Sequence, residues 1–211
     1  MVTAKNWIFG AVIFATIMAS ASIAADTVQG LLNDPAYAKN IRTKYVRSNL
    51  LPDGVAFRSI LVLVKAFNDE DPYDADFMVQ SNMGLEGNES IVFKDLLLAS
   101  LESLKSAEST VTQEMACEFG VPRASGEGVY PLFEAMDDAV DDLAAASLET
   151  LLGKLDADTA ARLQQWLTIQ KVNVVHVRFN HKEHYATAGM SADVSIANIC
   201  ISAESTNGRM Q

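Results

Sequence analysis

Residues 57–67 read FRSILVLVKAF, and this stretch decides the fold class. Its apolar residues recur every three or four positions, which is the spacing of one face of an α-helix. The face consists of Phe57, Ile60, Leu61, Val64 and Phe67. A helix with so wide an apolar stripe is expected to be buried against other elements.

Helical patterns continue on the C-terminal side of that stretch. We expect a long helix from about Ser90 to Phe119, because Gly120 suits the position after a helix end and Pro122 follows it. Another helix is expected to end near Gly153, and Asp156 is placed to cap the next one. The sequence therefore predicts an all-α protein, a compact helical bundle of about five to seven helices. The supporting apolar positions are Phe93, Leu97, Leu101, Leu104, Phe133, Met136, Val140, Leu143, Leu163, Trp166 and Leu167.

A basic helix is expected on the N-terminal side, from about Pro35 to Ser48, because proline suits the first turn of a helix. It contains no acid and carries Lys39, Arg42, Lys44 and Arg47. It could dock onto the acidic face of Glu134–Asp142 in the same or a neighbouring molecule, or contact an anionic partner. Charge balance within the molecule is the simpler interpretation.

The chain after Lys171 has two interpretations. Residues 172–179 and 194–201 are rich in β-branched side chains and could pair as a short C-terminal β-hairpin. Alternatively, the Trp166 helix continues through Phe179 and a last helix follows Gly189. Met190, Val194, Ala197 and Ile201 fit a helical stripe, so we favour the second interpretation.

Residues 1–24 have the pattern of a secretory signal peptide. Lys5 precedes an uncharged apolar run, and small residues around Ala24 suit cleavage before Ala25. An uncleaved membrane anchor is the alternative. With cleavage, we expect an exported protein of the periplasm or extracellular space, without a stable membrane anchor. Residues 25–211 would form a single helical domain, with an internal loop at 120–131 and a loose tail from about 205.

Composition excludes some classes of protein. The 211 residues include 16 Lys and Arg against 27 Asp and Glu, a net charge of −11, which argues against a nucleic-acid partner. A hydrophobic content of 49% argues against disorder. In an oxidising compartment, Cys117 and Cys200 are expected to form a disulfide, worth about 4 kcal/mol in the chain-entropy view.

The histidines His176, His181 and His184 are close in sequence. On a helix, His181 and His184 would share a face and could bind one divalent metal ion, weakly unless a third ligand joined them. The simpler interpretation is a solvated, charged segment. His176 lies in an apolar run, which favours a buried, hydrogen-bonded core residue.

Two acidic segments also invite functional interpretations. Residues 68–76 resemble a calcium loop in acidity, but the EF-hand pattern fails, and capping by Asp74 or Asp76 is simpler. The acids of 134–142 could act as paired carboxylates, as in glycosidases. They fall between apolar positions, so a solvated helix face is the simpler interpretation. These acids are Glu134, Asp137, Asp138, Asp141 and Asp142.

No nucleophile elbow, phosphate-binding glycine loop or dinucleotide fingerprint occurs in the sequence. The leading hypothesis is an exported, non-enzymatic helical protein that binds a protein or small-molecule partner, with no cofactor expected. The alternative is a divalent-metal-binding or metal-dependent protein centred on His181 and His184. An enzyme assembled from distant residues is the third possibility.

Overall fold

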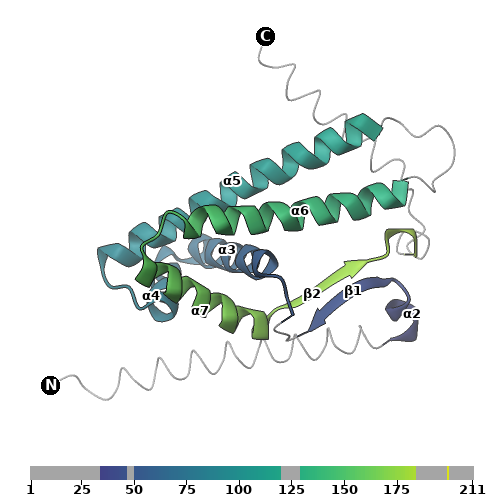
Figure 1. Cartoon of the computed structure of the whole chain (residues 1–211). Helices are drawn as coiled ribbons and strands as arrows, with labels where there is room; N and C mark the ends of the chain where they lie inside the picture. The colour runs from purple at the N-terminus through teal and green to yellow at the C-terminus, as the bar shows by residue number, and fades with distance from the viewer. Residues whose placement is uncertain (1–33, 47–49, 120–128, 184–198, 200–211) are drawn as a thin grey trace, which may run out of the picture. The chain divides into compact units, whose positions relative to one another are not determined.

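The computed structural model describes residues 34–46, 50–119, 129–183 and 199. Contacts divide the chain into two units, Met1–Ile41 and Arg42–Gln211, and each is described by itself. In the described part of the first unit, α2 spans Pro35–Ala38. Strand β1 (Ile41–Val46) begins at Ile41, which is the last residue of that unit. The second unit then contains α3 (Asp53–Glu70), α4 (Pro72–Met83), α5 (Asn88–Phe119), α6 (Val129–Leu152), α7 (Ala157–Asn173) and β2 (Val175–Phe179) (Figure 1).

Helix α3 is the centre of the second unit, because it packs against α4, α5, α6 and α7. The side chains of Phe57, Ile60, Leu61 and Val64 are completely buried, as the opening stripe predicts. They join one apolar cluster, hereafter the main core, to which the other four helices contribute. The predicted all-α fold class is thereby confirmed. Representative contributions from those helices are Val79, Met83, Leu97, Leu101, Leu148, Leu151, Leu163 and Trp166.

The long helices α5 and α6 lie close to the predicted ranges and run side by side (Figure 1). One face of α5 is buried through Phe93, Leu97, Leu101 and Leu104, as expected. Helix α6 begins at Val129, so the C-terminal part of the expected loop at 120–131 is helical. Near the C-terminal end of α5, a smaller second cluster contains Ala116, Val129, Phe133 and Met136.

The backbones of α3 and α6 approach each other closely at Gly54. A Cβ atom at this position would lie 2.5 Å from the backbone nitrogen of Ala145 and 2.8 Å from its Cα. Real Cβ atoms essentially never come so near to backbone atoms. Gly54 is therefore required by the packing of two helices.

Two aspartates determine where helices begin. Asp71 separates α3 from α4, and its carboxylate accepts a hydrogen bond from the Tyr73 N–H at 2.9 Å. Pro72 follows at the first helical position, so the expected acidic break at 68–76 shrinks to one residue. The cap is thus Asp71, and not Asp74 or Asp76. The cap predicted at Asp156 is confirmed, because its carboxylate accepts from the N–H groups of Asp158 and Thr159 at 3.0 Å.

The expected basic helix over Pro35–Ser48 is wrong. Of its described residues, Pro35–Ala38 are helical, and Ile41–Val46 forms β1, which pairs antiparallel with β2 in a two-stranded ribbon (Figure 1). Ile41, Thr43 and Tyr45 are β-branched or aromatic, and such side chains favour a strand once a partner is available.

The expected continuation of the Trp166 helix through Phe179 is also wrong, because α7 ends at Asn173 and Val175–Phe179 is a strand. The last helix expected after Gly189 lies outside the described residues except at Ile199, which is helical. The alternative hairpin interpretation placed that strand correctly within 172–179. Its partner is β1 and not 194–201. Apart from Ile199, the segment 194–201 lies outside the described residues.

Three other expectations fall on residues that the structure does not describe. These are the signal peptide at 1–24, most of the loop at 120–131 and the loose tail from about 205. None of the helices in the described part of the chain combines the length and apolar character needed to span a bilayer. Export and the single domain over 25–211 stay predictions.

Candidate functional site

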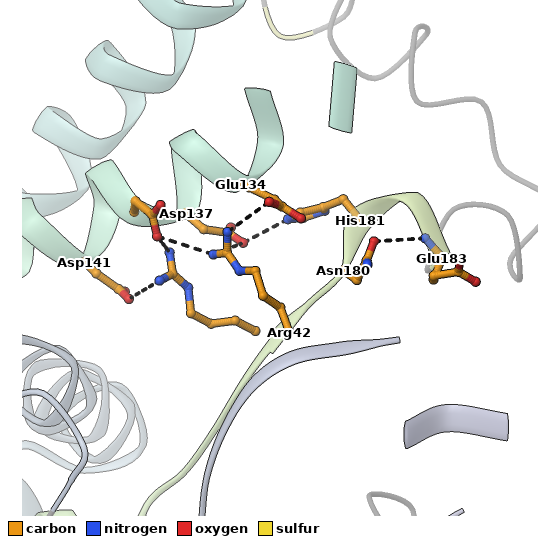
Figure 2. A network of polar contacts seen from close by, with 9 residues as sticks. Arg42, Glu134, Asp137, Asp141, Asn180, His181 and Glu183 are labelled. Carbon is orange, nitrogen blue, oxygen red and sulfur yellow. Dashed lines mark hydrogen bonds and ion pairs between the residues drawn. The ribbon is translucent and has the colours of Figure 1, made fainter. Parts of the chain in front are cut away.

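The acidic face of α6 consists of Glu134, Asp137, Asp138 and Asp141, and the ribbon packs its basic side chains against it. From β1, the Arg42 guanidinium lies 3.3 Å from a carboxylate oxygen of Glu134 and 3.3 Å from one of Asp138. The same group is 3.9 Å from Asp137. Figure 2 shows Arg42 pointing into this set of carboxylates. Charge balance within the molecule is confirmed for Arg42, although a strand and not a helix carries it.

Two residues from the other end of the chain join this network. Arg178 on β2 lies 2.5 Å from Asp138 Oδ1 and 3.5 Å from Asp141 Oδ2. His181, just after β2, shares a hydrogen bond of 2.9 Å with Asp137 (Figure 2). Its ring stacks on Phe133 at 5.2 Å between centroids. The expectation of a solvated acidic face therefore holds only in part: Asp138 and Asp142 are exposed, whereas Glu134, Asp137 and Asp141 are partly buried.

An open groove of about 390 Å³ borders the acidic face of α6 at Asp141 and is bounded by α3, α7 and the start of β2. We call it the α3–α7 groove. Most of its lining is aliphatic. Polar side chains from four elements, α3, α6, α7 and β2, also line it. The aliphatic residues are Val55, Val62, Leu63, Ala66, Val174 and Val175, and the polar residues are Arg58, Ser59, Asp141, Gln170 and His176.

Three of these polar residues form hydrogen bonds with other residues of the chain. Arg58 donates two hydrogen bonds to the Glu108 carboxylate, at 2.7 Å from Nε and 3.0 Å from Nη2. This paired geometry raises the pKa of the Arg58 guanidinium. Gln170 donates to the Ser59 hydroxyl at 3.2 Å, and Ser59 donates to the carbonyl of Ala56 at 2.7 Å.

Burial shifts the pKa values of two groove residues, Asp141 and His176, in opposite directions. Partial burial raises the pKa of the Asp141 carboxyl, against the opposing charge of Arg178. Partial burial lowers the pKa of the His176 imidazole, against the nearby charge of Asp141. His176 stacks on Tyr45 across the ribbon, with ring centroids 6.3 Å apart. It is half-buried, and its Nε2 has no hydrogen-bond partner among the described residues. The prediction of a buried, hydrogen-bonded histidine is therefore right only for its partial burial.

The predicted metal ligands are only partly described. His181 contacts Asp137, and His184 lies outside the described residues. In the described part of the chain, no three His, Cys, Asp or Glu side chains are arranged to hold a metal ion. The acids proposed for calcium have other contacts: Asp69 pairs with Lys65, Asp71 caps α4, and Asp76 lies 2.8 Å from Lys94.

The predicted disulfide also reaches beyond the described residues. Cys117 lies near the C-terminal end of α5, and Cys200 is not described. Their sequence neighbours do meet, since Ile199 packs against the second cluster, which contains Ala116. This proximity supports the pairing, which stays a prediction.

A second open groove, of about 370 Å³, runs between α5 and α6. Its lining is mainly alanine, serine and leucine, and Lys154 is its only charged residue within the described part of the chain. Its polar side chains are hydroxyls and one ammonium group, and its described lining contains none of the carboxylate, imidazole or guanidinium groups found in the α3–α7 groove. Sequence reasoning missed both grooves, because each requires knowledge of which helices are neighbours.

No protein-family model, curated protein or solved structure matches this chain.

Proposed function

We propose that this chain is an exported, non-enzymatic helical binding protein whose ligand site is the α3–α7 groove. The observation that carries the proposal is a mostly aliphatic groove into which a few polar side chains converge. Its volume of about 390 Å³ falls within the range of small-molecule sites, about 300–1,000 Å³. A small molecule is therefore the partner that the groove suits best.

The bonds around the groove support binding over catalysis. Ser59 donates its hydroxyl hydrogen to a backbone carbonyl, and its oxygen accepts from Gln170, so it is hydrogen-bonded to no activating base among the described residues. Arg58 is held in two hydrogen bonds by Glu108. These side chains form rigid walls, and rigid walls favour affinity because little order is lost on binding.

A neutral fluorescent probe, N-phenyl-1-naphthylamine, tests the site. Val62 is exposed and lines the groove, so Val62→Glu should place a charge there without disturbing the core. We expect it to weaken probe binding at least about tenfold, or about 1.4 kcal/mol. Val92→Glu is the matched control, because Val92 is an exposed helical valine that lines neither groove.

Equal probe affinity in both variants and the parent protein would contradict the groove as ligand site.

Export has a separate test, which is the mass of the protein recovered from the periplasm or medium of producing cells. Cleavage before Ala25 is the expected result, and an intact N-terminus would contradict it. Under non-reducing conditions the same measurement should show the Cys117–Cys200 disulfide as a loss of two hydrogens.

A metal-binding function is the second candidate, and one contact favours it. The hydrogen bond between Asp137 and His181 is the kind of carboxylate contact that orients metal-binding imidazoles. Stoichiometric zinc, copper or nickel in the purified protein, lost in His184→Ala, would support this candidate. A protein purified without metal, and unable to bind added zinc, would refute it.

A further inference from the structure

The charges around the α3–α7 groove point to a particular chemical class of ligand. We infer that the groove selects a molecule with an apolar body and a cationic ammonium head, and that the Asp141 carboxylate binds the head. This inference rests on the proposed function, because it assumes that the groove is a ligand site.

Asp141 supplies the carboxylate of the described groove lining. Its side chain is 24% exposed, and its ion pair in the described structure is with Arg178 at 3.5 Å. Arg178 lies nearer to Asp138, at 2.5 Å, so its positive charge is shared unequally. A partly buried carboxylate whose cationic partner is shared with a second carboxylate gains from an ammonium group that brings both charge and hydrogen-bond donors.

Arg58 does not make the groove suitable for an anion. Glu108 already occupies two of its guanidinium N–H groups and balances its charge. An anionic ligand would compete with Glu108 for the charge of Arg58 and would also meet Asp141. The overall charge of −11 adds to this preference, because an acidic protein attracts cations to its surface.

The rest of the groove suits an aliphatic or aromatic body. Val55 and Val62 come from α3, and Val174 and Val175 follow α7, so apolar walls face the ligand from two elements. Burying each methylene against such walls contributes about 0.8 kcal/mol. The His176 ring offers a further flat surface beside Asp141.

Three six-carbon probes separate the parts of this inference: hexylammonium, hexanol and hexanoate. Titration calorimetry or amide chemical shifts should show hexylammonium binding at least about tenfold more tightly than hexanol, with hexanoate weakest. Asp141→Asn should remove the advantage of hexylammonium and leave hexanol binding unchanged. Asp142→Asn is the matched control, because the neighbouring Asp142 is exposed and does not line the groove.

The outcomes distinguish this inference from the proposed function. If hexanol binds, Val62→Glu weakens it and hexylammonium has no advantage, the groove is a ligand site but the inferred cation selectivity is wrong. If none of the probes binds, both are wrong. If Asp142→Asn removes the advantage as fully as Asp141→Asn, general attraction by the acidic protein explains it, and Asp141 is not the binding group.

A pH series gives an independent readout. Since burial raises the pKa of Asp141, protonation should neutralise the carboxylate at a higher pH than for an exposed aspartate. Hexylammonium affinity should fall as the pH drops through this pKa, while hexanol affinity stays constant. Parallel changes for the two probes would overturn the assignment of Asp141.

Discussion

The main core around α3 and the ribbon beside α6 are held by different forces. In the main core, Phe57, Ile60 and Leu61 are fully buried among the apolar side chains of four other helices. In the ribbon, all five residues of β2 are only partly buried, and the polar contacts run from Arg42, Arg178 and His181 to the acidic face of α6. Burial of apolar surface is largely insensitive to salt and pH, whereas ion pairs at partly exposed sites respond to both.

The main core and the ribbon are therefore expected to contribute differently to the stability of the protein. The stability of the bundle is expected to come from the main core, and the ribbon is expected to contribute little because exposed ion pairs are each worth under about 1 kcal/mol. Both regions nevertheless meet the α3–α7 groove, through α3 on one side and His176 on the other.

The largest effect is expected from Phe57→Ala in the main core. Phe57 is 0% exposed, and truncation should leave a cavity and lower the free energy of unfolding by about 3–5 kcal/mol. Urea denaturation followed by circular dichroism measures it. Phe77→Ala is the control, because Phe77 on α4 is 47% exposed and should lose far less. Similar losses in both variants would contradict the position of the core.

A smaller effect is expected where α3 and α6 touch. Gly54→Ala should force the two helices apart and reduce the free energy of unfolding by about 1–3 kcal/mol. Gly153→Ala is the control, because its new Cβ would meet the Glu149 carbonyl oxygen at an ordinary 3.4 Å. A Gly54→Ala variant as stable as the parent would show that the backbones are not in contact there.

The ribbon should respond more weakly. Arg178→Met keeps an apolar stem and removes the ion pairs with Asp138 and Asp141, so we expect a loss of about 1 kcal/mol at low salt. The difference from the parent should shrink in about 1 M NaCl, where charges are screened. Lys105→Met, which removes an exposed pair with Glu102, should change little. A loss that is independent of salt would indicate packing instead of charge.

The smallest effect concerns pH. Because burial lowers the pKa of His176 from 6.5, the unfolded chain binds a proton more readily than the folded protein below about pH 6.5. The His176 contribution to stability should therefore be present above pH 6.5 and be lost as the pH falls through the lowered pKa. His176→Phe preserves a ring beside Tyr45 and should lack this component in melting curves recorded between pH 4 and 8. Identical pH dependence in both proteins would contradict it.

Much of the bundle could be predicted from sequence because its signals are local. The stripes of α3 and α5, and the cap at Asp156, depend on residues within a few turns of one another. The ribbon could not be predicted in this way, since β1 and β2 favour strands only when they meet. In isolation, Ile41–Val46 lies in a segment that also suits a basic helix, and tertiary pairing decided the outcome.

The candidate site was predicted only in fragments. The sequence pattern singles out both Asp141 and His176, but it indicates a solvated face for Asp141 and the core for His176. Their common groove depends on how α3, α6 and α7 pack, which no local pattern encodes. The docking of Arg42 on the acids was predictable from charge alone, because opposite charges in one acidic chain favour contact.

The ribbon has a consequence for the order of folding. Its strands come from opposite ends of the described bundle, with α3, α4, α5, α6 and α7 between them in sequence. Joining segments so far apart carries a loop-closure entropy that no local contact offsets in advance. We therefore expect the helices to assemble first and to bring β1 and β2 together, so that the groove acquires its last wall late in folding.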